Sequence, residues 1–161
     1  EVIHDRVNLQ KMRPLTEKEY YVRGTTALLD AVGGAIHHIG NVHKYAREED
    51  RPEKTLFVIT TDGLENASRR YSYEQVKQMV ERQKAKYGWE FIFLGANIDA
   101  AKEAARFGIS LDCAADYHAD SDGTVCMYEA VNDAVCCARA NRPVSQDWKR
   151  NVDNDYKNRK K

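Results

Sequence analysis

The sequence has no excess of either charge, because its 25 Lys and Arg residues are matched by 25 Asp and Glu residues. A general polyanion binder carries a basic surplus on one face, so we expect no nucleic-acid partner. Long apolar runs are also absent, since none approaches the roughly 18 residues of a membrane helix. The first residues do not form a signal peptide. We therefore expect a cytoplasmic protein with no membrane partner.

Cysteine, proline and glycine are scarce. The four cysteines, Cys113, Cys126, Cys136 and Cys137, all lie in the last third of the chain, unlike the spread of a secreted disulfide framework. We expect them to be reduced. With three prolines, nine glycines and 42% hydrophobic residues, the chain has the composition of a folded protein with a core of its own.

The common catalytic and cofactor motifs are missing from the sequence. There is no Gly-x-Gly-x-x-Gly turn, no Gly-Lys-Ser/Thr phosphate loop, no Gly-x-Ser-x-Gly elbow and no His-Glu-x-x-His helix. Cys136 and Cys137 are a poor zinc clamp, because neighbouring residues on a helix point about 100° apart. We therefore predict no catalytic residues and expect that the protein is not an enzyme.

Strand and helix patterns alternate along the chain. Apolar, β-rich runs without alternation are typical of strands buried on both faces, and apolar residues at three- and four-residue steps indicate helices packed on a sheet. This order predicts an α/β fold of three layers, with a mostly parallel, doubly wound (Rossmann-like) sheet covered by helices on both faces. The strands are expected at 55–61, 89–94 and 113–118, and the helices at 28–39, 72–87, 99–107 and 125–138.

Local signals predict where several elements begin and end. Ser72 and Gln75 form a capping-box pattern, and Gly88 marks a helix end. Asp99 is expected to cap the helix at 99–107, and a threonine is expected to cap the helix that begins near residue 28. The broken alternation of residues 1–15 predicts one or two edge strands. We expect one α/β domain over residues 1–140 and a polar, flexible tail over 141–161.

Oxygen-bearing side chains follow and precede these elements at one edge of the predicted sheet. Asp62 comes directly after a buried strand, and Thr25 and Thr26 precede the first helix. Ligands bind outside the carboxyl ends of strands in such sheets, at the point where strand order reverses. A carboxylate with a hydroxyl suits a hard cation such as Mg²⁺. The alternative is that Asp62 and Gly63 form only a turn and that the threonines serve only as a helix cap.

Two sequence stretches resemble motifs of the von Willebrand factor type A (vWA) domain. They are Gly24-Thr-Thr-Ala-Leu-Leu-Asp-Ala-Val32 and Leu56-Phe-Val-Ile-Thr-Thr-Asp-Gly63, and the resemblance runs from roughly Glu1 to Phe107. It implies a metal-ion-dependent adhesion site (MIDAS) in which Thr26 and Asp62 are metal ligands. Asp30 matches an acid outside the first coordination shell of such a site.

The sequence departs from this family in one respect. The family builds its metal site from a third piece, an Asp-x-Ser-x-Ser motif, and no such motif occurs in these residues. We therefore expect that the vWA-like domain is incomplete at its N-terminus, or that it is a degenerate member whose metal site is empty.

The resemblance implies a protein-binding module of adhesion or scaffold type. A bound Mg²⁺, Mn²⁺ or Ca²⁺ would complete its coordination with a carboxylate of a partner protein. Two alternatives stay open: a metal-assisted phosphoryl hydrolase that uses Asp62 with Asp99 or Asn97, and a metal-free scaffold whose loops contact another subunit.

Overall fold

A parallel sheet organises the part of the chain that the structure describes, which is residues 2–19, 24–142, 144 and 146–159 of a computed structural model. Its strands are β1 (Leu56–Thr61), β2 (Glu90–Gly95) and β3 (Ala114–Asp116), in the order β1-β2-β3. Both strand pairs are parallel. This confirms the predicted α/β fold with a parallel sheet.

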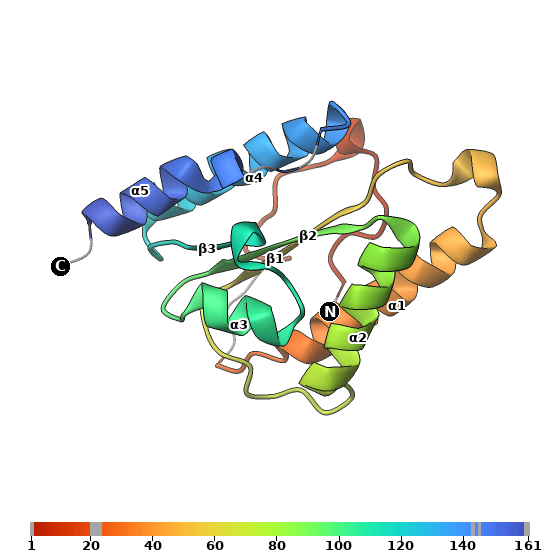
Figure 1. Cartoon of the computed structure of the whole chain (residues 1–161), viewed down its shortest axis with the longest axis horizontal. Coiled ribbons are helices and arrows are strands. Elements are labelled where there is room, and N and C mark those ends of the chain that lie inside the picture. The colour runs from red at the N-terminus through yellow and green to blue at the C-terminus, as the bar shows by residue number, and fades with distance from the viewer. Residues whose placement is uncertain (1, 20–23, 143, 145, 160–161) are drawn as a thin grey trace.

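Helices cover both faces of this sheet (Figure 1). One face packs on α1 (Leu28–Tyr45), α2 (Tyr73–Tyr87) and α3 (Ala100–Arg106). The other packs on α4 (Ser121–Arg139) and α5 (Arg150–Asn158). The three layers therefore agree with the sequence prediction.

The two cores follow from the alternation of side chains along each strand. Phe91 and Phe93 of β2 are buried against α1, α2 and α3, whereas Ile92 and Leu94 are buried against α4 and α5. Because β2 is the central strand and is apolar on both faces, it joins the two cores. Short 3₁₀ turns connect the elements at Leu9–Lys11, Glu48–Asp50, Leu111–Cys113 and Gln146–Lys149.

The predicted capping signals of α2 and α3 are confirmed. Ser72 Oγ accepts a hydrogen bond from Gln75 N, and the Gln75 side chain accepts one from Ser72 N, which completes the capping box. Gly88 ends α2 in the left-handed conformation, with φ of 64°. Asp99 caps α3 by accepting from Lys102 N at 2.9 Å.

The edge strands predicted for residues 1–15 are not found in the described part of that segment, so this prediction was wrong. Arg6 has a φ of 50°, and the turn at Leu9–Lys11 follows, so the chain cannot stay extended. The apolar side chains of the segment are not packed either, since Val2 is 74% exposed and Leu9 is 69% exposed. Glu1 lies outside the described residues.

Residues 141–161 are polar as predicted, but the expected flexible tail is not what the described part of this segment forms, because much of it packs on the domain. Residues 143, 145, 160 and 161 lie outside the described residues. Trp148 and Val152 are fully buried beside α4 and β3, and the Trp148 indole N–H donates to Asp112 O at 3.0 Å. Lys149 Nζ donates to two backbone carbonyls of the 111–114 segment. Two apolar side chains four residues apart are enough to dock one face of a short helix, although the mean composition of the segment is polar.

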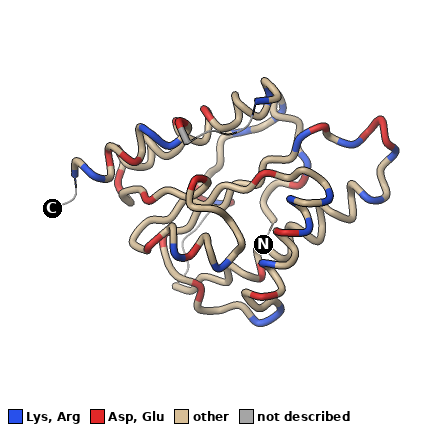
Figure 2. The backbone as a smooth tube through the Cα atoms, in the orientation of Figure 1, with Lys and Arg blue, Asp and Glu red and all other residues tan. Residues whose placement is uncertain are grey.

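Acidic and basic residues are interspersed along the helices and loops (Figure 2). Within the described residues, none of the helices is both long enough and apolar enough to cross a membrane.

Candidate functional site

Asp62 follows β1 directly, as the sequence predicted, and lies at the carboxyl end of the sheet. It is exposed, and among the described residues no hydrogen bond or ion pair is recorded for its carboxylate. The hydroxyl of the buried Thr61 shapes the turn, since it donates to Gly63 O at 2.8 Å. The turn is therefore held by Thr61, and the carboxylate of Asp62 remains available.

Strand order does not reverse in the described sheet, so the site is not at a switch point of the kind that the sequence suggested. Asp62 instead ends the edge strand β1, and Asn97 follows its neighbour β2. Asn97 is exposed and has a φ of 58°.

Thr26 does not cap α1, which corrects the prediction of a threonine cap. The N-cap position belongs to Ala27, which makes no side-chain cap bond. Groups from the 62–71 loop take over this role: Leu29 N donates to Glu65 Oε2 at 2.8 Å, and Asp30 N donates to Ser68 Oγ at 2.9 Å. These bonds satisfy backbone N–H groups in the first turn of α1. The hydroxyl of Thr26 is therefore not needed as a cap.

The 62–71 loop is fastened to the start of α1 by a reciprocal pair of hydrogen bonds. Thr26 N donates to Asn66 Oδ1 at 2.9 Å, and Asn66 N donates to Thr26 O at 3.0 Å. A Cβ placed on Gly63 would lie 3.8 Å from Thr26 Oγ1. The structure therefore places the Thr26 hydroxyl near the turn that carries Asp62.

Glu65 organises the loop from within. Besides Leu29 N, it accepts hydrogen bonds from Ala67 N, Ser68 N and Ser68 Oγ at 2.7–2.9 Å. Burial alone would raise the pKa of Glu65, but these bonds outweigh it and hold the pKa below its ordinary value. The carboxylate is therefore ionised at neutral pH and fully engaged in structure.

Asp30 performs the same task from the helix side. Its carboxylate accepts from Arg69 N at 3.0 Å, Arg70 N at 2.8 Å and Tyr71 N at 3.0 Å. The bond from Arg69 N, with those from the next two residues, holds the pKa of Asp30 below its ordinary value. Asp30 thus anchors the end of the loop.

Sequence reasoning missed the roles of Glu65, Asn66 and Ser68. The segment was read only as a polar loop, because the groups that these side chains bind lie 36 to 40 residues earlier in the chain. The available signal was a run of acceptor side chains directly after Asp62-Gly63, more than a simple turn needs.

The chemistry that this arrangement offers is a hydroxyl and an unpaired carboxylate on one rim. Both are hard oxygen donors of the kind that Mg²⁺ prefers, and Mg²⁺ sites often use only one or two protein carboxylates and keep several waters. The described residues contain no cluster of three or more His, Cys, Asp or Glu side chains that could hold a metal. A hydroxyl and a carboxylate are the types of ligand that a hard cation uses, and water would have to supply most of the remaining ligands.

Comparison with protein-family models, with curated proteins and with solved structures found no match to this chain.

Proposed function

We propose that the chain is a vWA-like protein-binding module in which Thr26 and Asp62 hold a divalent cation that engages an acidic group of a partner protein. The observation that carries this proposal is the position of the Thr26 hydroxyl beside the Asp62–Gly63 turn. Neither side chain is used for capping or for ion pairing in the described residues.

The different roles of Asp30, Glu65 and Asp62 support this proposal. Asp30 and Glu65 accept backbone N–H groups and fix the loop, whereas Asp62 fixes nothing. An exposed acid without a structural partner, on a loop held this firmly, is a candidate for binding. Because the pKa values of Asp30 and Glu65 stay low, two further negative charges lie near the proposed cation at neutral pH.

The proposed binding step needs no proton transfer. Mg²⁺, or Mn²⁺ or Ca²⁺ in its place, would supply positive charge at the rim and accept a carboxylate oxygen of the partner. Thr26 and Asp62 would orient the ion, and Asn66 would keep the Thr26 backbone in place. The hydrolase alternative has less support, because Asp99 is occupied as the cap of α3.

Partner capture with the full chain tests this function. Immobilised wild-type protein is compared in Mg²⁺ and in chelator, alongside Asp62→Ala and a matched control, Asp133→Asn, on the exposed surface of α4. The proposal predicts a partner that is retained by wild type and by the control in Mg²⁺ only, and is lost with Asp62→Ala. Capture that ignores both the chelator and Asp62→Ala would instead favour the metal-free scaffold.

A further inference from the structure

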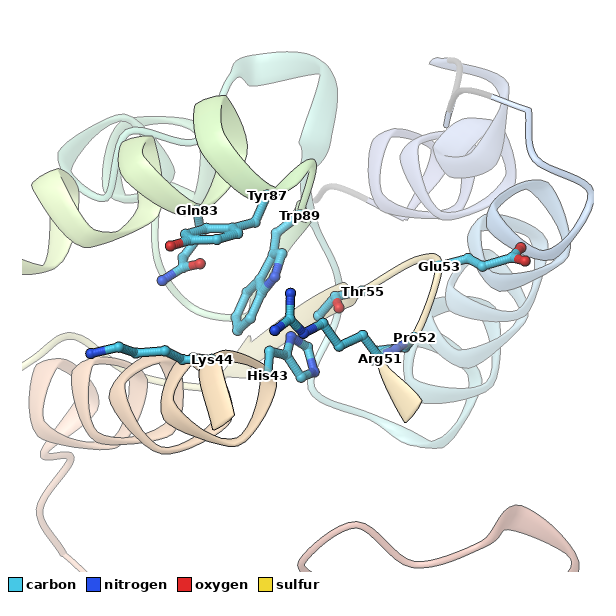
Figure 3. A pocket seen from close by; sticks show the side chains of 10 residues that line it. His43, Lys44, Arg51, Pro52, Glu53, Thr55, Gln83, Tyr87 and Trp89 are labelled. Carbon is cyan, nitrogen blue, oxygen red and sulfur yellow. The ribbon is translucent and has the colours of Figure 1, made fainter. Parts of the chain in front are cut away.

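A pocket opens at the amino-terminal ends of β1 and β2, the end of the sheet opposite Asp62. It lies between the last turns of α1 and α2 and the segment that leads into β1, and its volume is about 150 Å³ (Figure 3). At about 3.3 Å per strand residue, Thr55 in its wall is roughly 20 Å from Asp62. The pocket is therefore separate from the proposed metal site, and its volume of about 150 Å³ suits a single six-membered ring.

Two side chains that line this pocket carry donor groups without a hydrogen-bond partner in the described residues. Arg51 Nε donates to Ala46 O at 3.2 Å, and no partner is recorded among the described residues for the terminal amino groups of its guanidinium. Figure 3 shows this guanidinium near the side chain of His43. The indole N–H of Trp89 likewise makes no hydrogen bond within the described part of the chain, and it is not a buried unsatisfied donor.

Negative charge is scarce on the same wall. Among the described residues that line the pocket, Glu53 is the only acid, and its side chain points away from the centre (Figure 3). Burial, together with the charge of Arg51, holds the pKa of His43 below its ordinary value. The positive charge of Arg51 is therefore not neutralised within the pocket.

Aromatic surfaces make up the apolar part of the lining. Tyr87 is half exposed and lies above Trp89 in Figure 3. Trp89 packs against His43, with ring centroids 5.4 Å apart, and stacks on Phe57 and Phe91, so only a small part of its ring faces the pocket. Flat aromatic walls favour a flat ligand, because rings gain most contact area when they stack or meet edge to face.

We propose that this pocket binds a small planar anion that consists of one aromatic ring and one carboxylate. The carboxylate pairs with the guanidinium of Arg51, whose N–H groups form a fork that matches two oxygens. The ring packs against the half-exposed Tyr87 and the small exposed part of Trp89. An anion without a ring would leave the Tyr87 ring uncovered, and a neutral ring would leave Arg51 without a counter-charge.

Benzoate is the probe that tests this proposal, with benzamide as a neutral ligand of the same shape and acetate as the same charge without a ring. The readout is the indole N–H cross-peak of Trp89 in a two-dimensional NMR spectrum of the full chain. Trp148 is an internal control, because its indole N–H is already bound to Asp112 O on the other face of the sheet. We expect benzoate to shift the Trp89 signal in a saturable way and to leave the Trp148 signal unchanged.

A pair of arginine variants tests whether the charge of Arg51 binds the carboxylate of benzoate. Arg51→Gln should weaken benzoate binding about tenfold, since a hydrogen-bonded charge contributes about 1.4 kcal/mol or more. Arg47→Gln is the matched control, because Arg47 lies on the same segment but pairs with Glu49 and Asp50. A conservative Arg51→Lys variant should bind with intermediate affinity.

Three results would overturn the proposal. One is the absence of a saturable shift at Trp89 with benzoate. Another is benzamide or acetate binding as tightly as benzoate, which would remove the need for the charge or for the ring. The third is an equal loss of benzoate affinity in Arg51→Gln and Arg47→Gln. That result would mean that benzoate responds to the net charge of the surface and not to Arg51 itself.

Discussion

Two adjacent glycines of α1 should respond in opposite directions to the same substitution. An added Cβ at Gly33 would lie 2.7 Å from Tyr71 Cγ and 2.8 and 2.9 Å from the two Cδ atoms of that ring. An added Cβ at Gly34 meets no atom within 4 Å. Both positions lie in the same helix, and both substitutions change helix propensity by the same amount. The difference between the two variants in free energy of unfolding therefore isolates the contact with Tyr71.

The magnitudes follow from this geometry. Gly34→Ala should stabilise the protein by about 0.5–1 kcal/mol, because glycine costs that much in a helix interior. Gly33→Ala gains the same amount but overpacks the contact, which typically costs about 1–3 kcal/mol. Tyr71 cannot easily move away, since the clash is at the base of its ring and its backbone N–H is bound to Asp30 at 3.0 Å. We therefore expect a net loss of about 1 kcal/mol for Gly33→Ala.

Chemical and thermal denaturation of the two variants measure this difference. For a chain of this length, a gap of about 2 kcal/mol corresponds to roughly 4–8 °C between their melting temperatures. A Tyr71→Ala background removes Cγ and both Cδ atoms and should therefore remove most of the penalty at Gly33, as a double-mutant cycle would show. Equal stabilities of the two variants, or a penalty that persists without the tyrosine ring, would refute the reasoning.

Three further predictions concern the fold and the loop. Glu65→Gln should lower stability at neutral pH by about 1–2 kcal/mol, allowing for partial exposure to solvent. Because the pKa of Glu65 is lower in the folded state than its ordinary value of 4.5, this contribution is fully present above that pH and is lost as the pH falls through the folded-state value. Urea unfolding at a series of pH values should thus bring wild type and variant together in acid; a constant gap would contradict this. Ser72→Ala should cost about 1 kcal/mol through loss of the capping box, whereas Ser110→Ala, at a position without a side-chain cap bond, should change little; similar effects in thermal melts would argue against the cap. Val152→Ala should cost about 1–3 kcal/mol, because its side chain is fully buried, and an unchanged melting temperature would mean that α5 does not pack on the domain in solution.

Features specified by nearby residues could be predicted from the sequence. The caps at Ser72 and Asp99 and the left-handed Gly88 depend on neighbours within a few positions, and the apolar runs of β1 and β2 indicate burial on both faces. Local propensity and hydrophobic period both act at this range. The order of elements and the three layers could be predicted for the same reason.

Features that depend on distant partners could not be predicted in this way. The cap of α1 comes from Glu65 and Ser68, and nothing near residue 28 reveals this. The docking of Trp148 and Val152 was concealed by the polar composition of the surrounding residues. For the candidate site, the sequence pointed to Thr26 and Asp62, but the hydrogen bonds that fasten the 62–71 loop to Thr26 were found only in the structure.

The central claim is that Thr26 and Asp62 share one divalent cation, and paramagnetic broadening by Mn²⁺ tests it most directly. Substoichiometric Mn²⁺, added to the labelled full chain, broadens the backbone amide signals nearest to the ion. The account predicts broadening that is centred on residues 25–27 and 62–66, that excess Mg²⁺ reverses and that Asp62→Asn abolishes. Broadening centred elsewhere, or unchanged in Asp62→Asn, would contradict it.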